Sequence, residues 1–189
     1  MLFRSDFDVR HRLVINWLWE VPFFRESSGM AGVLVGGWQI NGVTALQSGF
    51  PFNVNTTLSY AAGGDYNGDG VNNDRPNLPS FGLTPPSTDQ QAYRDGLFVA
   101  ADFPRPSVLG TLPRNAYLGP GFASTDLSLF KDFKLPVHNA RIQVRAEAFN
   151  VFNRINLQRP NGNMAQATFG RSTQSFAARE LQFAVKLIF

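Results

Sequence analysis

A run of acidic, amide and glycine residues between Asp65 and Asp74 is the part of this 189-residue chain whose residue types and spacing best match a known chemistry. Its letters, DYNGDGVNND, match the first half of an EF-hand calcium loop, in which oxygen-bearing side chains at alternate positions converge on one cation. Gly70 falls where such a loop turns sharply. The predicted calcium ligands are Asp65, Asn67, Asp69, the Val71 carbonyl, Asn73 and Asp74.

One position of this run departs from the calcium pattern. The twelfth residue should be a bidentate Glu, and here it is Pro76, so Asp74 would have to substitute from two residues earlier. The alternative interpretation is a cluster of turns, because Asn, Asp and Gly are the residues that turns prefer. Calcium is the one cofactor that the sequence suggests, and both interpretations stay open.

Other chemistry finds little support in the sequence. The chain has no cysteine, which excludes disulfides, zinc–thiolate sites and cysteine nucleophiles. No serine-hydrolase, zinc-protease or phosphate-loop motif is present, so we expect no enzymatic activity. The net charge is only +3 and the Lys and Arg residues are scattered, whereas nucleic-acid binding favours a basic stripe.

The elements that would position these residues are strands, because apolar residues recur at every second position. In the segment 141–148, Ile142, Val144, Ala146 and Ala148 alternate with Arg141, Gln143, Arg145 and Glu147. Successive side chains of a strand point to opposite faces, so this segment is predicted to have one apolar and one polar face. The ending LQFAVKLIF repeats the pattern. We therefore expect Leu13, Ile15, Trp17, Val144, Phe183, Val185 and Leu187 on one face, and Arg145, Glu147 and Gln182 on the other.

Five such strands are predicted, over 8–21, 33–54, 122–133, 140–153 and 178–189. These segments are 12 to 22 residues long, whereas strands of globular proteins usually have 3–10. Long alternating strands are typical of outer-membrane barrels, whose strands need about 9–11 residues to cross the hydrocarbon. No apolar run is long enough for a transmembrane helix.

The connections between these strands alternate between short and long. Residues 55–121 and 154–177 form the long ones, and they would be extracellular loops, because bacterial barrels have short periplasmic turns and long outer loops. Eight of the 12 prolines lie between Pro76 and Pro120, so the first long connection should be a structured loop rather than more sheet. Within it, 88–99 has a weakly helical composition that Ser87 or Thr88 could cap.

Several motifs together resemble one family. They are DVRHRLV from Asp8, GWQINGV from Gly37, GFPF from Gly49, GPGF from Gly119, DLSL from Asp126, EAFNVFN from Glu147, FGR from Phe169 and the ending LQFAVKLIF from Leu181. In this order they resemble the C-terminal barrel of TonB-dependent outer-membrane receptors, and among these the Oar-like branch with a carboxypeptidase-regulatory-like N-terminal domain. The resemblance covers nearly all of residues 1–189.

The resemblance implies a fold, a location and a set of partners. It implies an all-β antiparallel meander of about five long transmembrane strands, a partial wall of a 22-stranded outer-membrane barrel with long extracellular loops. It places the protein in the outer membrane of a Gram-negative-type bacterium. The terminal Phe189, with apolar residues at every second position before it, resembles the signal read by the barrel assembly machinery.

The sequence lacks the plug, the TonB-binding segment and a signal peptide. We therefore expect a C-terminal part of a larger reading frame that does not transport alone. Its partners would be the remaining barrel strands and the plug of the full receptor, outer-membrane lipid and the assembly machinery. TonB would act only through the N-terminal part, and no nucleic acid is expected. Two alternatives remain: an outer-surface, calcium-dependent binding module, and a soluble secreted β-domain that binds glycans.

Overall fold

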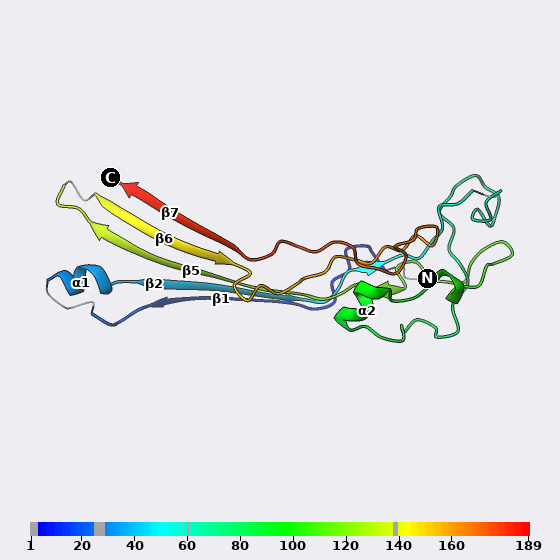
Figure 1. Ribbon diagram of the computed structural model, residues 1–189, viewed down its shortest axis with the longest axis horizontal. Coiled ribbons are helices and arrows are strands. Elements are labelled where there is room, and N and C mark those ends of the chain that lie inside the picture. The colour runs from blue at the N-terminus through cyan, green and yellow to red at the C-terminus, as the bar shows by residue number, and fades with distance from the viewer. Residues whose placement is uncertain (1–3, 25–28, 60, 138–139) are drawn as a thin grey trace. The chain divides into compact units, whose positions relative to one another are not determined.

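The computed structural model describes residues 4–24, 29–59, 61–137 and 140–189, and these form two compact units (Figure 1). The strand unit consists of the described parts of residues 13–46, 123–155 and 177–189. The loop unit consists of the described parts of residues 1–12, 47–122 and 156–176. Each unit therefore combines segments that lie far apart in the sequence.

The strand unit is one antiparallel sheet of five strands. In spatial order these are β1 (Arg12–Glu20), β2 (Gln39–Gln47), β5 (Phe122–Lys134), β6 (Arg141–Phe149) and β7 (Glu180–Ile188). Because the spatial order follows the chain order, the sheet is a meander, and the predicted all-β fold class is confirmed. The strands have 9 to 13 residues, and all except β5 are shorter than the sequence predicts, but they are long enough to cross a bilayer's hydrocarbon.

The register of the last strands confirms the predicted faces. Val144 pairs with Val185 and Ala146 with Phe183, whereas Glu147 pairs with Gln182. Residues directly opposite each other in a sheet share a face, so the apolar set and the polar set lie on opposite sides of the β6–β7 pair. The β5–β6 register continues this division, with Leu127, Leu129 and Phe133 on the apolar side and Ser128 and Asp132 on the polar side.

A ladder of polar contacts follows the polar face. Gln143 donates to the Asp132 carboxylate at 2.9 Å, and the Arg145 guanidinium lies 3.2 Å from Glu147. Ser128 donates to Glu147 at 3.4 Å, and the Arg145 guanidinium lies over the Phe130 ring at 5.7 Å from its centroid. Such partly exposed pairs contribute about 0–1 kcal/mol each, so they tie neighbouring strands together only weakly.

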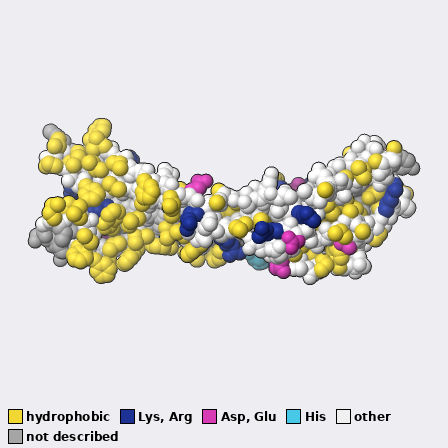
Figure 2. Space-filling view, viewed as in Figure 1, with side chains coloured by type: hydrophobic (Ala, Val, Ile, Leu, Met, Phe, Trp, Pro, Cys, Tyr) yellow, Lys and Arg dark blue, Asp and Glu magenta, His cyan; other side chains and the backbone are white. Residues whose placement is uncertain are grey.

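Most of the apolar face is uncovered among the described residues of the strand unit. Phe183 and Val185 of β7 are 79% and 73% exposed, and every residue of β1 is exposed. Figure 2 shows hydrophobic side chains gathered over the strands. A continuous apolar face of this extent needs an apolar environment to cover it. No helix among the described residues is long and apolar enough to cross a membrane.

The prediction of a single strand over 33–54 is wrong. Its beginning belongs to helix α1 (Met30–Val35), its middle is β2, and its end is the short strand β3 (Pro51–Phe52), which pairs with β4 (Tyr117–Leu118) of the loop unit. The MAGVLV run of α1 has no alternation, so it does not favour a strand with one apolar and one polar face. Gly36 and Gly37 end the helix, since Gly37 has a φ of 74° and a Cβ on Gly36 would lie 2.3 Å from the Phe24 carbonyl oxygen.

The predicted strands over 8–21 and 140–153 are also too long. Residues 8–11 precede β1, and the backbone of His11 is bonded to Ser48, whose hydroxyl accepts from the His11 N–H at 3.1 Å. After β6 the chain turns at Asn150, which has a left-handed φ of 49°. The Asn150 N–H donates to the Asp126 carboxylate at 2.8 Å, so the ladder stops there. The strands predicted over 122–133 and 178–189 correspond to β5 and β7 within two residues at either end.

Lys131 is a charged residue on the apolar face of β5. It pairs with Val144, yet it is only 4% exposed. Its ammonium donates to the Gly36 carbonyl and lies 5.8 Å and 5.1 Å from the ring centroids of Trp38 and Phe133. The chain that leaves α1 therefore covers this charge and satisfies it with a carbonyl and two aromatic faces.

The loop unit has a hydrophobic core of its own. It contains β3, β4, helix α2 (Gln90–Asp95) and a 3-10 turn, η1 (Ala100–Asp102). The core residues are Phe52, Val54, Tyr93, Leu97, Phe98, Phe103, Leu112, Tyr117, Leu157 and Phe169. Phe98 contacts the rings of Tyr117, Phe103 and Phe169, with centroids 5.0 to 5.5 Å apart. Each such ring pair contributes about 0.5–1.5 kcal/mol of stability beyond that from burying its apolar area. These contacts join the two long connections into one packed body.

Helix α2 lies within the segment 88–99 that the composition predicts to be helical. Its N-cap is Asp89, one residue after Thr88 and two after Ser87, which were the predicted caps. The Asp89 carboxylate accepts from the Ala92 N–H at 2.7 Å, and this bond is the main reason why the pKa of Asp89 lies below its usual value.

Candidate functional site: a cleft in the loop unit

The Asp65–Asp74 run folds into a tight loop whose carboxylates bind its own backbone. Asp65 is 3% exposed and accepts from the N–H groups of Gly68 at 2.7 Å and Gly70 at 2.9 Å. The Asp74 carboxylate accepts from Tyr66 and Asn67 at 2.5 and 3.2 Å. These are the bonds that Asp side chains make in turn clusters.

The remaining predicted ligands make similar local contacts. Asp69 accepts from the Val71 N–H at 2.7 Å and from the Asn67 side-chain amide at 3.0 Å. The Val71 carbonyl accepts from the Asn73 N–H at 2.9 Å. In the described part of the chain, no group of three or more His, Asp or Glu side chains is placed to hold a metal ion. The geometry thus favours the turn-cluster interpretation, and the calcium site stays a prediction.

Asn73 and Asp74 also contribute to a polar cavity of about 570 Å³. Amide and charged side chains form most of its wall, and the lining residues are Asn53, Asn55, Asn73, Asp74, Arg75, Leu109, Gly110 and Arg114. The structure therefore brings Asn73 and Asp74 toward Asn53 and Arg114, which lie far from them in the sequence. Asp65, Asn67, Asp69 and Val71 do not line this cavity.

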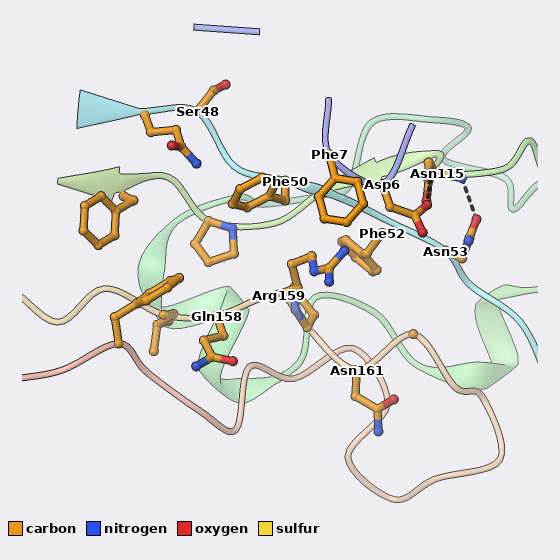
Figure 3. Close-up of a pocket in the computed structure, with 17 residues that line it drawn as sticks. Asp6, Phe7, Ser48, Phe50, Phe52, Asn53, Asn115, Gln158, Arg159 and Asn161 are labelled. Atoms are coloured by element: carbon orange, nitrogen blue, oxygen red, sulfur yellow. Dashed lines mark hydrogen bonds between the residues drawn. The ribbon is translucent and has the colours of Figure 1, made fainter. Parts of the chain in front are cut away.

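A larger cleft of about 770 Å³ opens on the loop unit, and we call it the Phe/Arg cleft (Figure 3). Most of its wall is apolar, with polar groups at a few points. The lining residues are Asp6, Phe7, Gln47, Ser48, Phe50, Phe52, Asn53, Asn115, Pro120, Phe122, Leu157, Gln158, Arg159, Pro160, Asn161, Gly162 and Phe176. A mostly apolar cavity of roughly 300–1,000 Å³ with a few fixed polar groups is the usual form of a small-molecule site.

Hydrogen bonds between distant segments hold the walls of the Phe/Arg cleft in place. The Gly119 N–H donates to the Phe50 carbonyl at 2.8 Å, and the Asn55 N–H donates to the Gly162 carbonyl at 3.0 Å. Gly162 must be glycine, because a Cβ there would lie 1.7 Å from the Asn53 carbonyl oxygen. The rings of Phe122 and Phe176 meet edge to face with centroids 5.2 Å apart.

Two charged residues line the Phe/Arg cleft, and their environments differ. Asp6 accepts from the Asn115 side-chain amide at 2.5 Å and lies 3.4 Å from the Arg114 guanidinium. The bond from Asn115, followed by the charge of Arg114, holds the pKa of Asp6 below its usual value. Arg159 is exposed, and its Nη1 donates to the Pro51 carbonyl at 3.4 Å.

The arrangement of Arg159 suits an anionic group inside the Phe/Arg cleft. Figure 3 shows the Arg159 side chain reaching into the cleft beside Phe7 and Phe52. Among the described lining residues Arg159 is the one cation, and Asp6 interacts with Arg114 more strongly than with Arg159. A guanidinium has five N–H donors, so it can bind a carboxylate in bidentate fashion.

Sequence reasoning alone missed the Phe/Arg cleft. Its residues come from four separate segments, near residues 6–7, 47–53, 115–122 and 157–176. Arg159 stands in no recognisable motif, and the abundance of phenylalanine, 18 residues in all, conceals the few that line the cleft. One sequence pattern indicated part of the cleft, namely the two similar motifs GFPF at Gly49 and GPGF at Gly119, which lie in or beside the paired strands β3 and β4. Glycine in such a segment can mark the close approach of another backbone.

Comparison with known proteins gives one result. Searches of the curated proteins and of the solved structures return no match. The model of a family described as "Outer membrane beta barrel domain" matches residues 3–182. This match favours the outer-membrane interpretation over the soluble secreted β-domain, and it agrees with the two-faced meander of the strand unit. The chain therefore belongs to this family of outer-membrane β-barrel domains, whose location is the outer membrane of Gram-negative-type bacteria.

Proposed function

We propose that this chain supplies part of the wall and of the outer surface of a TonB-dependent receptor of the Oar-like branch, and that it has no enzymatic activity. The observation that carries the proposal is the combination of a two-faced meander with long connections that pack into a separate cored unit. In a receptor barrel, the apolar face contacts lipid, the polar face lines the interior, and the outer loops meet the solute first. The motif resemblance supports the same assignment.

The two edges of the sheet support the presence of further strands. β1 and β7 are its outermost strands, and each has an outer row of backbone N–H and C=O groups. In hydrocarbon, unpaired backbone groups cost several kcal/mol each, so only a closed barrel spans a membrane. The proposed partners are the remaining strands and the plug of the receptor, outer-membrane lipid and the barrel assembly machinery. TonB would act through the receptor's other parts, and no nucleic acid is involved.

A second candidate is an outer-surface binding module without transport. The observation that favours it is the aromatic core of the loop unit, which gives the long connections a fixed shape of their own. Such a module would present its cavities to the outside and would need no energy from TonB.

The test of the proposal uses outer membranes of the source bacterium and an antibody raised against residues 61–121. We expect the antibody to recover a polypeptide much heavier than 20.9 kDa that contains plug peptides and that formaldehyde cross-links to TonB. A polypeptide of 20.9 kDa that gives no TonB cross-link would overturn the proposal and would favour the surface module. Cross-linking of a known receptor to TonB in the same membranes is the positive control.

A further inference from the structure

We propose that the Phe/Arg cleft binds a small organic anion, with an apolar ring or chain among its phenylalanines and one carboxylate on Arg159. As the ligand class of a receptor, this proposal rests on the proposed function. The binding itself is a property of the loop unit and is measured without TonB. The shape, the lining residues and the charge of the Phe/Arg cleft support this proposal.

The aromatic walls of the Phe/Arg cleft suit an apolar ligand body. Phe50, Phe52, Phe122 and Phe176 present aromatic surface to a volume of about 770 Å³, which suits a body of one or two rings. Phe122 and Phe176 already meet edge to face, so a ring placed beside them continues a favourable aromatic arrangement. Burial of apolar area would be the main source of affinity in such a site.

The charged side chains of the Phe/Arg cleft suit an anionic group on the ligand. Arg159 is the one cation among the described lining residues, and its bond to the Pro51 carbonyl, at 3.4 Å, engages one of its five N–H donors. Asp6, the one acid there, binds Asn115 and Arg114, and its attraction to Arg159 is weaker than its attraction to Arg114, so Arg159 keeps N–H donors for a ligand anion. A carboxylate would find a guanidinium at the edge of an apolar surface, where charge-assisted bonds are strong.

The backbone on either side of Arg159 is held in place by hydrogen bonds, which reduces the entropy lost when a ligand binds. Gln158 and Asn161, on either side of Arg159, donate from their backbones to the carbonyls of Gln174 and Arg171, each at 2.9 Å. Arg159 therefore stands on a backbone that is fixed on both sides before any ligand arrives. Such preorganisation lowers the entropy that is lost on binding.

The test uses the full chain in dodecyl maltoside micelles, which cover the apolar face of the strand unit, with 2-naphthoate as the anionic probe and 2-naphthylmethanol as its neutral counterpart. Binding is followed by calorimetry. The variant Arg159→Gln removes the charge, Arg159→Lys retains it, and Arg94→Gln on the exposed face of α2 is the matched control outside the cleft. We expect Arg159→Gln to weaken naphthoate binding about tenfold or more, in line with the loss of a charge-assisted bond. Arg159→Lys should lose less, and Arg94→Gln should bind as the parent does.

The neutral probe shows whether the cleft is intact. We expect 2-naphthylmethanol to bind the parent and Arg159→Gln equally. No naphthoate binding by the parent, or equal loss of both probes in Arg159→Gln, or equal naphthoate affinity in Arg159→Gln and Arg94→Gln, would overturn the proposal. A missing TonB cross-link together with Arg159-dependent naphthoate binding would overturn the receptor function and leave the anion site standing.

Discussion

At the scale of single residues, the polar groups of the loop unit mostly serve the backbone around them. The buried carboxylate of Asp65 accepts two backbone N–H groups, and Asp89 accepts the N–H that starts α2. Arg159 differs, because its one described hydrogen bond is a long contact with a carbonyl. Arg159 is therefore the residue of the loop unit that we propose to bind a ligand.

The double variant Asp65→Ala, Asp69→Ala should loosen the loop whether or not calcium is present. Removing the Asp65 carboxylate leaves two N–H groups without their acceptor, which costs about 1–3 kcal/mol. The measurement is the rate of protease cleavage within residues 61–75 in calcium and in chelator. Faster cleavage of the variant in both conditions supports the turn cluster. Protection of the parent that requires calcium and vanishes in the variant would support the EF-hand-like site instead.

Tyr117 gives the loop unit a dependence on alkaline pH. Burial raises the pKa of Tyr117 to about 12, and its hydroxyl donates to the Gly82 carbonyl at 3.0 Å. An unfolded tyrosine loses its proton near pH 10, whereas the folded one keeps it until about 12. The unfolded state therefore binds fewer protons in this range, and the stability that is present below pH 10 is lost as the pH rises.

The variant Tyr117→Phe should be less stable than the parent at pH 9 by about 0.5–1.5 kcal/mol, the usual worth of one hydrogen bond. It should also lose less stability between pH 10 and 12, because its ring does not titrate. Urea unfolding followed by near-ultraviolet circular dichroism at pH 9 and pH 11 measures both effects. Parallel losses of stability in the two proteins would show that Tyr117 is not the group responsible.

At the scale of elements, periodicity predicted the strands and composition predicted α2, but not where the elements end. Strand β5 could be predicted almost to the residue, because the alternation of Thr125, Leu127 and Leu129 with polar residues marks its middle. The end of β6 could not, because it depends on the bond between Asn150 and Asp126 of the neighbouring strand. Helix α1 was missed because six apolar residues without alternation fit a buried strand as well as a helix.

The candidate site was less predictable than the elements. The Asp65–Asp74 loop could be located from the sequence because its contacts are local. The Phe/Arg cleft depends on four segments whose meeting is fixed by tertiary packing, for example by the approach of Gly162 to Asn53. Apart from the two Gly–aromatic turns, no local spacing indicates such a meeting.

The two faces of β7 should respond differently to the same charge. Val185 lies on the apolar face opposite Val144, whereas Gln182 lies on the polar face opposite Glu147. A lysine in the lipid-facing middle of a strand costs about 2–4 kcal/mol, so Val185→Lys should sharply reduce the fraction of the receptor that folds in the outer membrane. Gln182→Lys gains an opposite charge across the strand and should fold as the parent does. Equal folding yields, measured by protease resistance, would contradict the assignment of faces.

At the scale of the whole molecule, the chain contains two kinds of folded material. The strand unit has an uncovered apolar face, whereas the loop unit buries an aromatic core. The strand unit therefore requires lipid, and the loop unit provides the cavities in which a solute could bind. The sequence predicted the first feature from alternation and described the second only as a structured loop.

Deletion of Phe189 should impair insertion into the outer membrane more than it impairs synthesis. Phe189 is 96% exposed, so no contact of its own holds it in the fold, and a structural cost of the deletion should be small. The expected loss arises because the alternating apolar ending resembles a signal for the assembly machinery. The measurement compares outer-membrane and total levels of the receptor by immunoblot, with Met164→Leu, a loop-unit substitution, as the control. An unchanged outer-membrane level would contradict the assembly role.

We expect one face of the meander to contact lipid and the other face not to. Spin labelling along β7 measures this difference between the faces. Because the chain has no cysteine, single cysteines can be placed at Leu181, Gln182, Phe183, Ala184, Val185, Lys186 and Leu187 without background labelling. Collision rates of the labels with oxygen, which dissolves in an apolar phase, and with a water-soluble nickel complex are then measured with the chain in detergent micelles, which cover its apolar face. We predict that odd positions are accessible to oxygen and even positions to nickel, with a period of two along β7. Equal accessibility at odd and even positions would contradict the membrane-spanning wall.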